Sequence, residues 1–573
     1  MRFDVETLKA QVAIVGGGAA GSAAAIRLAA RGFKVILVEK AGLERSGCLA
    51  PGVNALNAYV GRGKTPQDYV DYAMADAHGV ARPDLLLSMA QRLNDQAKWL
   101  QSIGLAIHLD AQGRFLERSW RNIQVNGENI KPKIAAQVRA QSNVTILERT
   151  VGSHFLVTDN QIQGLVAFQT RAPKIILIRA AAVICATGGA AGLYRPHNPH
   201  GCQNRVWYPP FNAGGGLAMG ILAGAEMTTL EMRFVALRVR DTFAPTGTLA
   251  LGVGAEQLNA QGAPYEAPYG RSTSQRVLAL RRQTQLGLGP CYLSAAANRD
   301  SRERVYRAYL NMCPAQTLKF LEEDADGLTQ DERILTVEIG ASEPYVQGGH
   351  TAGGYWVDTD RQSTVNGLWA IGDVAGGCPQ KYVTGALAEA ELAAESVATF
   401  LSQPTNNLSS GHHASLSGEL NLDPDEKRAI EELNKHFTNP PSPYQAQDLL
   451  QALQKTLDLY AGGVSADYRY SRAQLMEAEK RLERLFPLAN ALKADTSADL
   501  LGIWELKERL VVARSLLAHL AARKETRWPG FGEYLDHPEV DGSLGFINSR
   551  FLAGRVQIIQ RPFSPKERYG RLD

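Results

Sequence analysis

The chain has 573 residues, of which 45% are hydrophobic and 21% are charged, and its net charge is only +3. Because acids and bases are nearly balanced and intermixed, neither nucleic acid nor an anionic membrane is indicated as the main partner. The length exceeds what one hydrophobic core can serve, so we expect roughly two to four domains.

Neither export nor metal binding is indicated by the sequence. The first residues lack the basic start and apolar run of a signal peptide, and no stretch of about 18 uncharged apolar residues predicts a membrane span. The six cysteines lie far apart without a C-x-x-C pair, so they predict no metal site and no iron–sulfur cluster within this chain. Their spacing is typical of a reducing compartment, and we expect a cytoplasmic protein.

A dinucleotide-binding fingerprint lies in residues 12–40, VAIVGGGAAGSAAAIRLAARGFKVILVEK. The pattern predicts a strand, a glycine-rich turn, an alanine-rich helix and a second strand that ends at Glu39. Gly16 permits the tight turn, Gly18 lets a pyrophosphate approach the backbone, and Gly21 lets the helix pack closely on the strand. The helix N-terminus offers N–H groups to the phosphates, and Glu39 can hydrogen-bond the adenosine ribose.

Two later segments distinguish FAD from NAD. Residues 174–189 and 365–377, KIILIRAAAVICATGG and VNGLWAIGDVAGG, each read as an apolar strand that runs into a glycine-rich turn. Together with the fingerprint they resemble the glutathione-reductase-like class of FAD proteins, in which the aspartate of the second turn binds the ribityl chain. That resemblance implies this role for Asp373. Because the three segments lie far apart in the sequence, we expect an FAD domain whose halves are separated by an insertion.

The predicted fold class is therefore α/β, with a discontinuous Rossmann-like FAD-binding domain, an inserted capping domain and a C-terminal helical domain. The FAD-binding domain is assigned to residues 1–241 and 343–402, and the cap to residues 242–342, where polar loops surround one amphipathic stretch. A polar linker, 403–424, leads to the helical domain, 425–573. The last part of that domain is aromatic and rich in turns, and we expect it to pack on the body or on a partner.

An arginine-bearing segment, TTLEMRFVALRVRDTFAPTG, covers residues 228–247. As a strand it would place Arg238 and Arg240 on the same face. Two cations on one face of a mostly apolar segment indicate either a solvated edge strand or an anion pocket.

The domain arrangement resembles the succinate dehydrogenase/fumarate reductase flavoprotein family over essentially the whole chain. Within that family, the sequence is similar to the alpha subunits of adenylylsulfate (APS) reductases. Four segments carry the similarity: LERSGCLAPGVNALNAYVG (43–61), RVWYPPFNAGGGLAMGILAGAEMTTLEMRF (205–234), GASEPYVQGGHTAGG (340–354) and RKETRWPG (523–530).

The sequence departs from the wider family at three places. Gly47 stands where succinate dehydrogenases have the histidine that is bonded to FAD, so the resemblance implies a non-covalent flavin. Ala244 replaces the substrate-binding histidine of the family's Gln-Phe-His-Pro-Thr-Gly stretch. Residues 381–386, KYVTGA, replace its carboxylate-binding Arg-Leu-Gly-x-Asn-Ser. A dicarboxylate clamp is therefore not predicted.

The resemblance to APS reductases implies a substrate site near the flavin. Trp207 would offer an aromatic face, and Arg238 a forked donor for phosphate or sulfate oxygens. His350 matches the family's His-x-x-Gly-Gly, and Arg276 ends a cap motif similar to its Arg-Asp-x-x-Ser-Arg. Without the family pattern, Trp207 would be assigned to core packing, and His350 equally to a loop or to a site. The implied catalytic set is Asn57, Trp207, Arg238, Arg276 and His350.

Arg238 is thereby selected for the anion pocket, whereas Arg233 and Arg240 are interpreted as structural ion pairs. The residues assigned to the cofactor are Gly16, Gly18, Gly21, Glu39, Lys40, Ser46, Thr187, Gly188 and Asp373.

The resemblance implies the reaction APS + 2 e⁻ ⇌ sulfite + AMP, whose physiological direction stays open. Reduced FAD would attack sulfur through N5, forming a flavin–sulfite adduct and releasing AMP. Since this chain has no cluster-binding cysteines, the electrons are expected from a ferredoxin-like beta subunit that carries 4Fe–4S clusters.

Two alternatives remain at this point. The first is a fumarate-reductase-like flavoprotein that acts on another anionic substrate; Arg276 and His350 favour it, and the lost clamp weighs against it. The second is an FAD-binding scaffold that uses its helical domain for assembly. The polar residues implied around the flavin ring weigh against a scaffold, which has no use for them.

Overall fold

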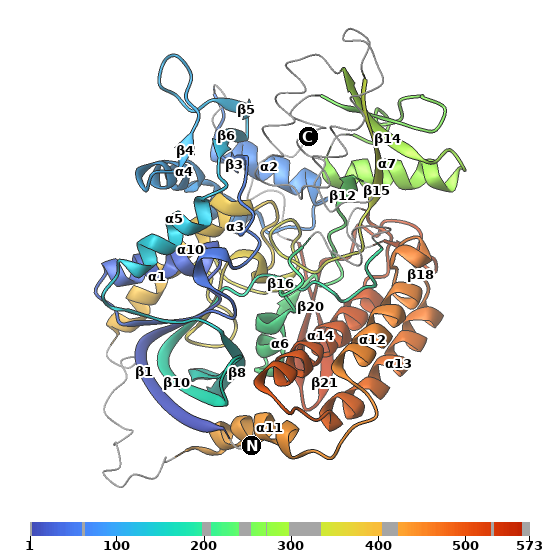
Figure 1. The fold of residues 1–573 in the computed structure, drawn as a ribbon. Helices are drawn as coiled ribbons and strands as arrows, with labels where there is room; N and C mark the ends of the chain where they lie inside the picture. Colours follow the sequence, from blue (N-terminus) through green and yellow to red (C-terminus); the bar gives the residue numbers. More distant parts are fainter. Residues whose placement is uncertain are drawn as a thin grey trace.

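The computed structural model describes residues 3–59, 63–197, 208–239, 254–270, 272–296, 334–403, 422–528 and 532–563 (Figure 1). Trp207, Arg240 and Ala244, most of the linker and much of the predicted cap lie outside these residues.

A seven-stranded sheet forms the centre of the first half. Its order is β7-β2-β1-β10-β9-β8, with β17 also paired to β10. The strands β1, β2, β7, β10 and β17 run parallel, whereas β8 and β9 are antiparallel additions at one side. The strands are β1 (Asp4–Val15), β2 (Val35–Val38), β7 (Val144–Leu147), β8 (Thr150–Thr158), β9 (Gln161–Gln169), β10 (Lys174–Cys185) and β17 (Leu368–Ala370).

The sheet explains why three distant segments make one site. Residues 12–15 of β1 and most of β10 are buried, as expected for parallel strands that are covered on both faces. Helix α1 (Ala19–Ala30) follows β1 and packs against α10 (Tyr382–Ser402). Since β1, β10 and β17 are parallel neighbours, the turns after them meet at one edge of the sheet. The predicted Rossmann-like, discontinuous arrangement is confirmed.

Smaller elements cover this half of the molecule. Strands β3, β4 and β5 each pair with β6 in a separate sheet. The elements are β3 (Ala55–Asn57), α2 (Pro66–Asp76), α3 (Pro83–Ala90), α4 (Leu93–Ser102), β4 (Ala106–Ile107), β5 (Glu117–Ser119), β6 (Asn122–Asn126) and α5 (Ile130–Arg139).

The described part of the cap is a four-stranded antiparallel sheet with one helix. The strands follow the order β12 (Leu237–Val239), β15 (Ile334–Ala341), β14 (Cys291–Ala296) and β13 (Glu256–Leu258). The amphipathic stretch predicted for the cap is helix α7 (Thr273–Gln285), which begins with a capping box at Ser272. The strand expected around Arg238 is short, and it pairs with β15.

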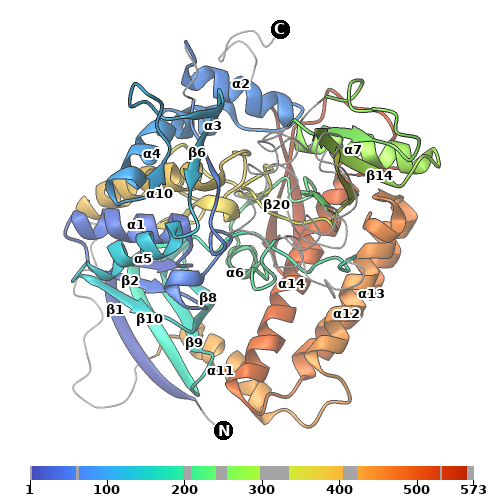
Figure 2. The same cartoon turned by 45° about the horizontal axis from the view of Figure 1, so that its top comes forward.

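The C-terminal region contains the predicted helices and ends in strands. The helices are α11 (Pro424–Thr438), α12 (Ala446–Tyr460), α13 (Arg472–Ala491) and α14 (Ser497–Ala522). Asp423 caps α11: its side chain accepts the N–H groups of Asp425 and Glu426, both at 2.9 Å. Figure 2 shows α12, α13 and α14 side by side, opposite the seven-stranded sheet. None of the helices in the described ranges is both long and apolar enough to cross a membrane.

The aromatic tail is a β-hairpin that packs on the body. Strand β20 (Phe546–Leu552) pairs with β21 (Arg555–Arg561) and with β11 (Met227–Thr228), and β11 also pairs with β16 (Gly354–Tyr355). Phe546 and Ile547 are buried. Residues 546–561 are thus joined to the first half through a sheet, and the exact domain limits remain a prediction.

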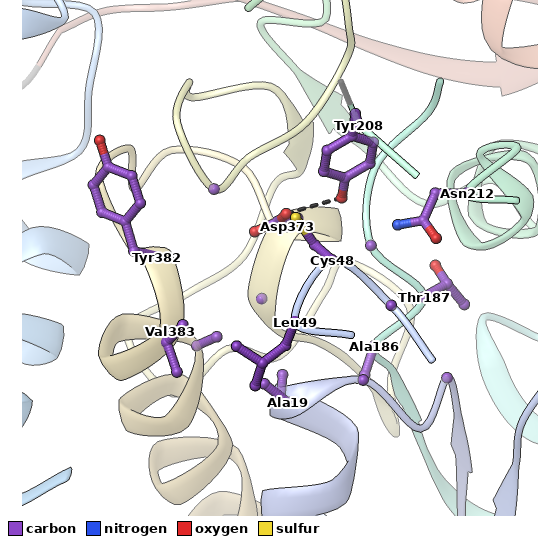
Figure 3. Close-up of a pocket in the computed structure, with 18 of the residues that line it drawn as sticks. Ala19, Cys48, Leu49, Ala186, Thr187, Tyr208, Asn212, Asp373, Tyr382 and Val383 are labelled. Atoms are coloured by element: carbon purple, nitrogen blue, oxygen red, sulfur yellow. Dashed lines mark hydrogen bonds between the residues drawn. The ribbon is translucent and has the colours of Figure 1, made fainter. Parts of the chain in front are cut away.

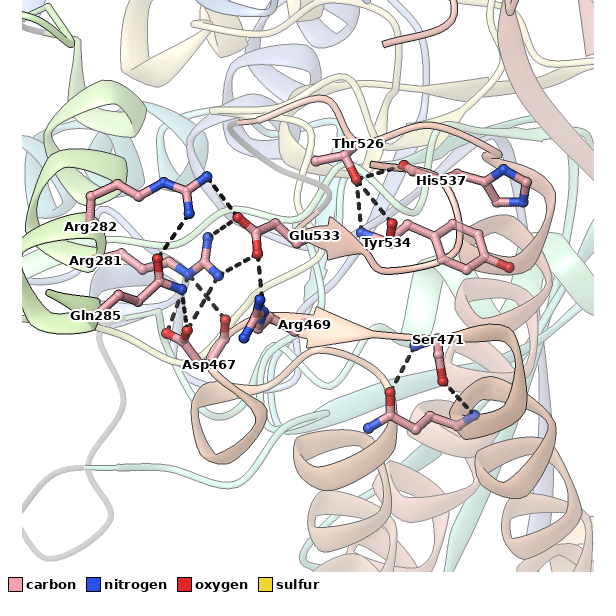
Figure 4. Close-up of polar contacts among 11 residues, drawn as sticks. Arg281, Arg282, Gln285, Asp467, Arg469, Ser471, Thr526, Glu533, Tyr534 and His537 are labelled. Atoms are coloured by element: carbon pink, nitrogen blue, oxygen red, sulfur yellow. Dashed lines mark hydrogen bonds and ion pairs between the residues drawn. The ribbon is translucent and has the colours of Figure 1, made fainter. Parts of the chain in front are cut away.

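A cluster of ion pairs joins the cap to the C-terminal region (Figure 4). Arg281 of α7, whose side chain is 1% exposed, donates from Nη1 and Nη2 to the two oxygens of Glu533, both at 2.8 Å. It also lies 3.3 Å from Asp467. Glu533 belongs to β19 (Glu533–Tyr534), which pairs with β18 (Arg469–Tyr470). A bidentate, buried arginine fixes position as well as distance, so the cluster anchors α7.

Candidate functional site

A cavity of about 490 Å³ lies where the central strands end (Figure 3). Its walls include Gly16 after β1, Glu39 after β2, Thr187 after β10 and Asp373 after β17. Residues from the cap side and from α14 complete the lining. This is the carboxyl edge of a parallel sheet, where doubly wound folds bind their ligands.

The glycine-rich turn forms a cradle at one end of the cavity. A Cβ on Gly16, whose φ is +100°, would lie 2.4 Å from the carbonyl oxygen of Ala186, and a Cβ on Gly21 would lie 1.9 Å from that of Gly16. Both glycines are therefore required by the contact of α1 with the sheet. A Cβ on Gly18 would meet no protein atom within 4 Å. The backbone at Gly18 is thus open to the cavity, at the N-terminus of α1, as close approach of a phosphate requires.

The acidic residue after β2 shapes the same end. The carboxylate of Glu39 accepts the N–H groups of Gly17 and Ala41, each at 2.7 Å, which fixes its orientation toward the turn. Lys40 lines the cavity and pairs with Glu505 at 2.8 Å. Ser46 is buried beneath the turn, with its hydroxyl 3.3 Å from the carbonyl of Gly17, and is not part of the lining.

A buried lysine supports the turn, and no motif indicated it. Lys131 of α5 donates from Nζ to the carbonyl oxygens of Gly17, at 2.8 Å, and of Leu43. Burial lowers the pKa of Lys131 to about 8. Its position on a helix remote in sequence carries no recognisable spacing, so only the folded chain reveals it.

Asp373 lies further along the cavity, between Tyr382 on one side and Thr187 and Asn212 on the other (Figure 3). Its carboxylate accepts a hydrogen bond of 2.9 Å from the hydroxyl of Tyr208, which itself accepts the N–H of Gly189 at 3.0 Å. Burial raises the pKa of Asp373. Cys48 lies beside it and is exposed to the cavity; the protein packed around the thiol and the charge of Asp373 raise its pKa to about 12, so Cys48 stays protonated.

His350 lines the cavity beside Tyr382 as a neutral ring. Its imidazole stacks on Phe234, with centroids 4.3 Å apart, and meets Tyr382 edge-on at 4.6 Å. Burial lowers the pKa of His350 to about 3. The ring therefore carries no charge at neutral pH, and it can bind an anion only as a hydrogen-bond donor.

Asn57 and Arg276 also line the cavity. The amide of Asn57 donates to the hydroxyl of Tyr69 at 2.5 Å and accepts from Asn122 at 2.7 Å, so both of its ends are held by the protein. Arg276 of α7 is buried, and its Nε lies 2.9 Å from a carboxylate oxygen of Glu266. Of these two, Arg276 is the one that brings a positive charge to the wall.

The structure places Arg238 along a different cavity. Arg238 is 5% exposed, donates to the backbone carbonyl of His197, and lines a second cavity of about 920 Å³ together with Arg195. It is not among the residues of the first cavity's wall. Arg233 is buried and donates to the hydroxyl of Tyr194 and the carbonyl of Ala461, both at 2.6 Å, which is a structural role. Trp207, from the same predicted set, lies outside the described residues.

Further polar residues of the wall were not predicted. Arg118, Arg121 and Asn122, around β5 and β6, line the first cavity, and the guanidinium of Arg121 lies 4.0 Å over the ring of Tyr72. Glu508 of α14 also belongs to the wall. In the described residues, no cluster of histidine, cysteine and carboxylate side chains could hold a metal ion.

The lining fits a flavin dinucleotide. The open backbone at Gly18 and the N-terminus of α1 suit a pyrophosphate, the acid at Glu39 suits a ribose, and Asp373 in the cavity wall suits a ribityl hydroxyl. Gly47 has no side chain that could bond covalently to the flavin.

Comparison with known proteins agrees with this geometry. The family model for an FAD binding domain matches residues 11–385. The adenylylsulfate reductase subunit alpha of Megalodesulfovibrio gigas is 29% identical, over 96% of this chain and 95% of the relative. Structures of adenylylsulfate reductase from Archaeoglobus fulgidus, and of adenosine-5-phosphosulfate reductase with sulfite as a covalent adduct, each match with a TM-score of 0.88 at 28% identity, over 98% of this chain and 97% of theirs. A quinol fumarate reductase of E. coli shares the fold, with a TM-score of 0.78 at 17% identity, over 97% of both chains.

Proposed function

Because the chain belongs to the FAD-binding-domain family of oxidoreductases, we propose that it is the flavoprotein subunit of an adenylylsulfate reductase, which interconverts APS with sulfite and AMP. The observation that carries the proposal is the likeness, over nearly the full length of both chains, to the alpha subunit of such a reductase in sequence and in fold. FAD supplies the electron-transfer chemistry, and the residues below hold it and the substrate.

The proposed cofactor contacts follow the cavity from end to end. The turn at Gly18, with the N-terminus of α1, takes the pyrophosphate, and Glu39 takes the adenosine ribose. Asp373, oriented by Tyr208, takes the ribityl chain. These contacts are all non-covalent, since Gly47 replaces the residue that would form a bond.

The wall around the flavin end suits a nucleotide sulfate better than a dicarboxylate. Lys381 occupies the clamp position, but it is fully buried, and its ammonium is held by the carbonyls of Gly372 and Ala375 and by Glu389. Of the residues that follow it, Ala386 lines the cavity with an apolar side chain and Tyr382 offers a hydroxyl but no positive charge. A dicarboxylate would thus lose the contact that the arginine of the family's Arg-Leu-Gly-x-Asn-Ser motif makes with a carboxylate.

The positive charge at this end comes from arginine. Arg276, held by Glu266, and Arg121 line the wall. A guanidinium near the bridging oxygen stabilises the charge that develops on AMP as it leaves. His350 contributes a neutral donor. Arg238, Asn57 and Trp207 remain part of the proposed substrate region, Arg238 from the side of the second cavity.

We place the chain in the cytoplasm with an iron–sulfur partner of the ferredoxin type. The support for the partner is the cysteine spacing in the sequence, which provides no cluster motif, together with the subunit name of the relative.

The decisive experiment compares two reactions on one preparation of the chain with its partner. AMP-dependent oxidation of sulfite should proceed, and reduction of fumarate should be absent. AMP should be required, because the proposed site releases it as the leaving group. Turnover of fumarate without any AMP-dependent oxidation of sulfite would overturn the substrate assignment and leave the fold and the flavin.

A further inference from the structure

Helix α14 brings a carboxyl group to the cavity from the C-terminal region. Glu508 is 5% exposed and belongs to the wall. Its Oε1 lies 2.7 Å from where a Cβ on Gly215 would be, so the carboxyl sits directly over the first residue of α6 (Gly215–Leu222). Packing of α14 on α6 fixes this position. No sequence motif of the dinucleotide site extends to this helix.

The carboxyl of Glu508 faces the cavity without a hydrogen-bond partner among the described residues. No hydrogen bond to it is found in the part of the chain that the structure describes, and the surrounding charges act on it only at a distance. Glu505, one turn earlier, pairs with Lys40 at 2.8 Å. Buried polar groups are nearly always bonded, because an unbonded one costs free energy. An unpaired acid that faces a cavity therefore indicates a ligand group opposite it.

The position of Glu508 selects the adenosine half of the cavity. Gly215 leads to Gly216, which touches Thr187 at the end of β10, since a Cβ there would lie 2.1 Å from the Thr187 hydroxyl. Met219 of the same helix, α6, lies against β8, since a Cβ on Gly152 would lie 3.4 Å from its Cε, and the charge of Lys40, next to Glu39, acts on Glu508. Asp373 and His350 belong to the flavin end. The group opposite Glu508 is therefore the part of the dinucleotide that lies beyond the ribose held by Glu39.

We propose that Glu508 recognises the adenine base of the bound dinucleotide. A neutral carboxyl has one O–H donor and one carbonyl acceptor side by side. On the edge that carries N6 and N7, adenine presents its exocyclic amine next to the N7 ring-nitrogen acceptor, which is the complementary pair, whereas hypoxanthine presents two acceptors there, O6 and N7. Glu508 donates to the ring nitrogen, accepts from the amine, and so links the C-terminal region to the cofactor.

The protonation state agrees with this geometry. Burial raises the pKa of Glu508 to about 7. The charged groups that face it are Lys40 after β2 and, on α14 itself, Glu505 and Arg509; α6 contributes none. Because the neutral form binds the base, the dissociation constant of FAD should be constant below pH 7 and should rise above it, by up to about tenfold per pH unit.

Binding of two dinucleotides to the full chain stripped of flavin tests the proposal. We would compare FAD with its deaminated analogue, flavin–hypoxanthine dinucleotide, by quenching of flavin fluorescence. At pH 6 the wild type should prefer FAD by roughly 3- to 10-fold, the range of one or two hydrogen bonds. Glu508→Ala should lose this preference. Glu508→Gln, whose amide keeps a donor and an acceptor, should keep part of the preference and bind FAD independently of pH between 6 and 9.

Glu505→Gln is the matched control, because it removes a carboxylate one turn away that pairs with Lys40; it should leave the base preference intact. Retained preference in Glu508→Ala, or the same pH dependence in Glu508→Gln and wild type, would overturn the proposal. The near-isosteric Gln variant keeps the test valid if the Ala variant folds poorly. The inference rests on the dinucleotide site alone, so its failure and that of the proposed reaction are distinguishable.

Discussion

The two ends of the cavity are built from different parts of the chain. At the dinucleotide end, the groups that face the ligand are mainly backbone atoms of one turn, held between β1 and α1 with Gly16 and Gly21 in close contact. At the substrate end, they are side chains such as Arg276 and His350, which come from the cap and from a distant loop. A backbone site depends on local geometry, so a change at its close contacts acts on folding, and only a change at its open backbone acts on the ligand. A side-chain site depends on how domains are placed, so changes there act on the ligand.

Substitution of two glycines in the same turn tests this contrast most strongly, because the two sites differ in what an added methyl group would meet. In Gly21→Ala the Cβ would lie 1.9 Å from the carbonyl oxygen of Gly16, and we expect the apoprotein to lose about 3 kcal/mol or more of its free energy of unfolding. In Gly18→Ala the Cβ would meet no protein atom within 4 Å. The apoprotein should change by less than about 1 kcal/mol, while its affinity for FAD should fall roughly tenfold or more.

Urea unfolding of both apoproteins, followed by titration with FAD, makes the measurement. Gly18→Ala serves as the control for the methyl group itself. If both variants unfolded at the same urea concentration as wild type, the close contact of α1 with the sheet would not be the reason for Gly21. If Gly18→Ala bound FAD as wild type does, the phosphate would not approach there.

The same contrast explains what could be predicted from the sequence. One local unit of strand, turn, helix and strand constrains Gly16, Gly18, Gly21 and Glu39. Their spacing is therefore visible in the sequence, and it predicted the position of the dinucleotide site at the edge of the sheet. The role of Asp373 came from the resemblance to glutathione-reductase-like FAD proteins, because an aspartate in a glycine-rich turn has no distinguishing local signal of its own. Lys131 and Glu508 reach the site from helices whose own periodicity only encodes burial, so nothing in their sequence marks them.

The substrate end was harder to predict for a related reason. The resemblance to APS reductases selected Arg238 for the anion pocket, whereas the structure places this arginine of the short strand β12 along the second cavity. Arg121 follows Arg114 and Arg118 in the sequence, and the spacing of these three arginines matches no known motif. The direction of such side chains is decided by tertiary packing, which one sequence does not contain.

Removal of Arg276 should affect the reaction and not the flavin. A hydrogen bond between charged groups contributes about 1.5–3 kcal/mol, so Arg276→Ala should lower kcat/KM for sulfite and AMP roughly 10- to 100-fold. The affinity for FAD should stay unchanged. Arg282→Ala, an exposed arginine of the same helix that pairs with Glu533 at 2.9 Å, is the control and should keep full activity. A loss of FAD binding in Arg276→Ala would contradict the separation of the two ends.

Loss of the α7 anchor should have a smaller effect. Arg281→Ala removes the bidentate contact to Glu533 and should lower the free energy of unfolding by about 1–2 kcal/mol. Arg282→Ala, which removes a contact at the rim of the same cluster, should cost less than about 1 kcal/mol. Because α7 carries Arg276, KM should rise in Arg281→Ala, and FAD should bind as in wild type. Equal effects of the two variants would mean that the cluster does not position the cap.

The smallest expected effect concerns the charge of His350. Its pKa is about 3 in the folded chain because of burial, against about 6.5 for an exposed histidine. Below pH 6.5 the unfolded chain binds a proton that the folded chain does not, so stability is lost as the pH falls. This single group should remove about 0.8 kcal/mol between pH 8 and pH 6. The difference in unfolding free energy between wild type and His350→Gln, measured in urea at several pH values, should therefore move against wild type on acidification. If this difference moved in favour of wild type, His350 would be a cation in the folded chain. The positive charge that binds an anion at the substrate end would then come from His350 as well as from arginine.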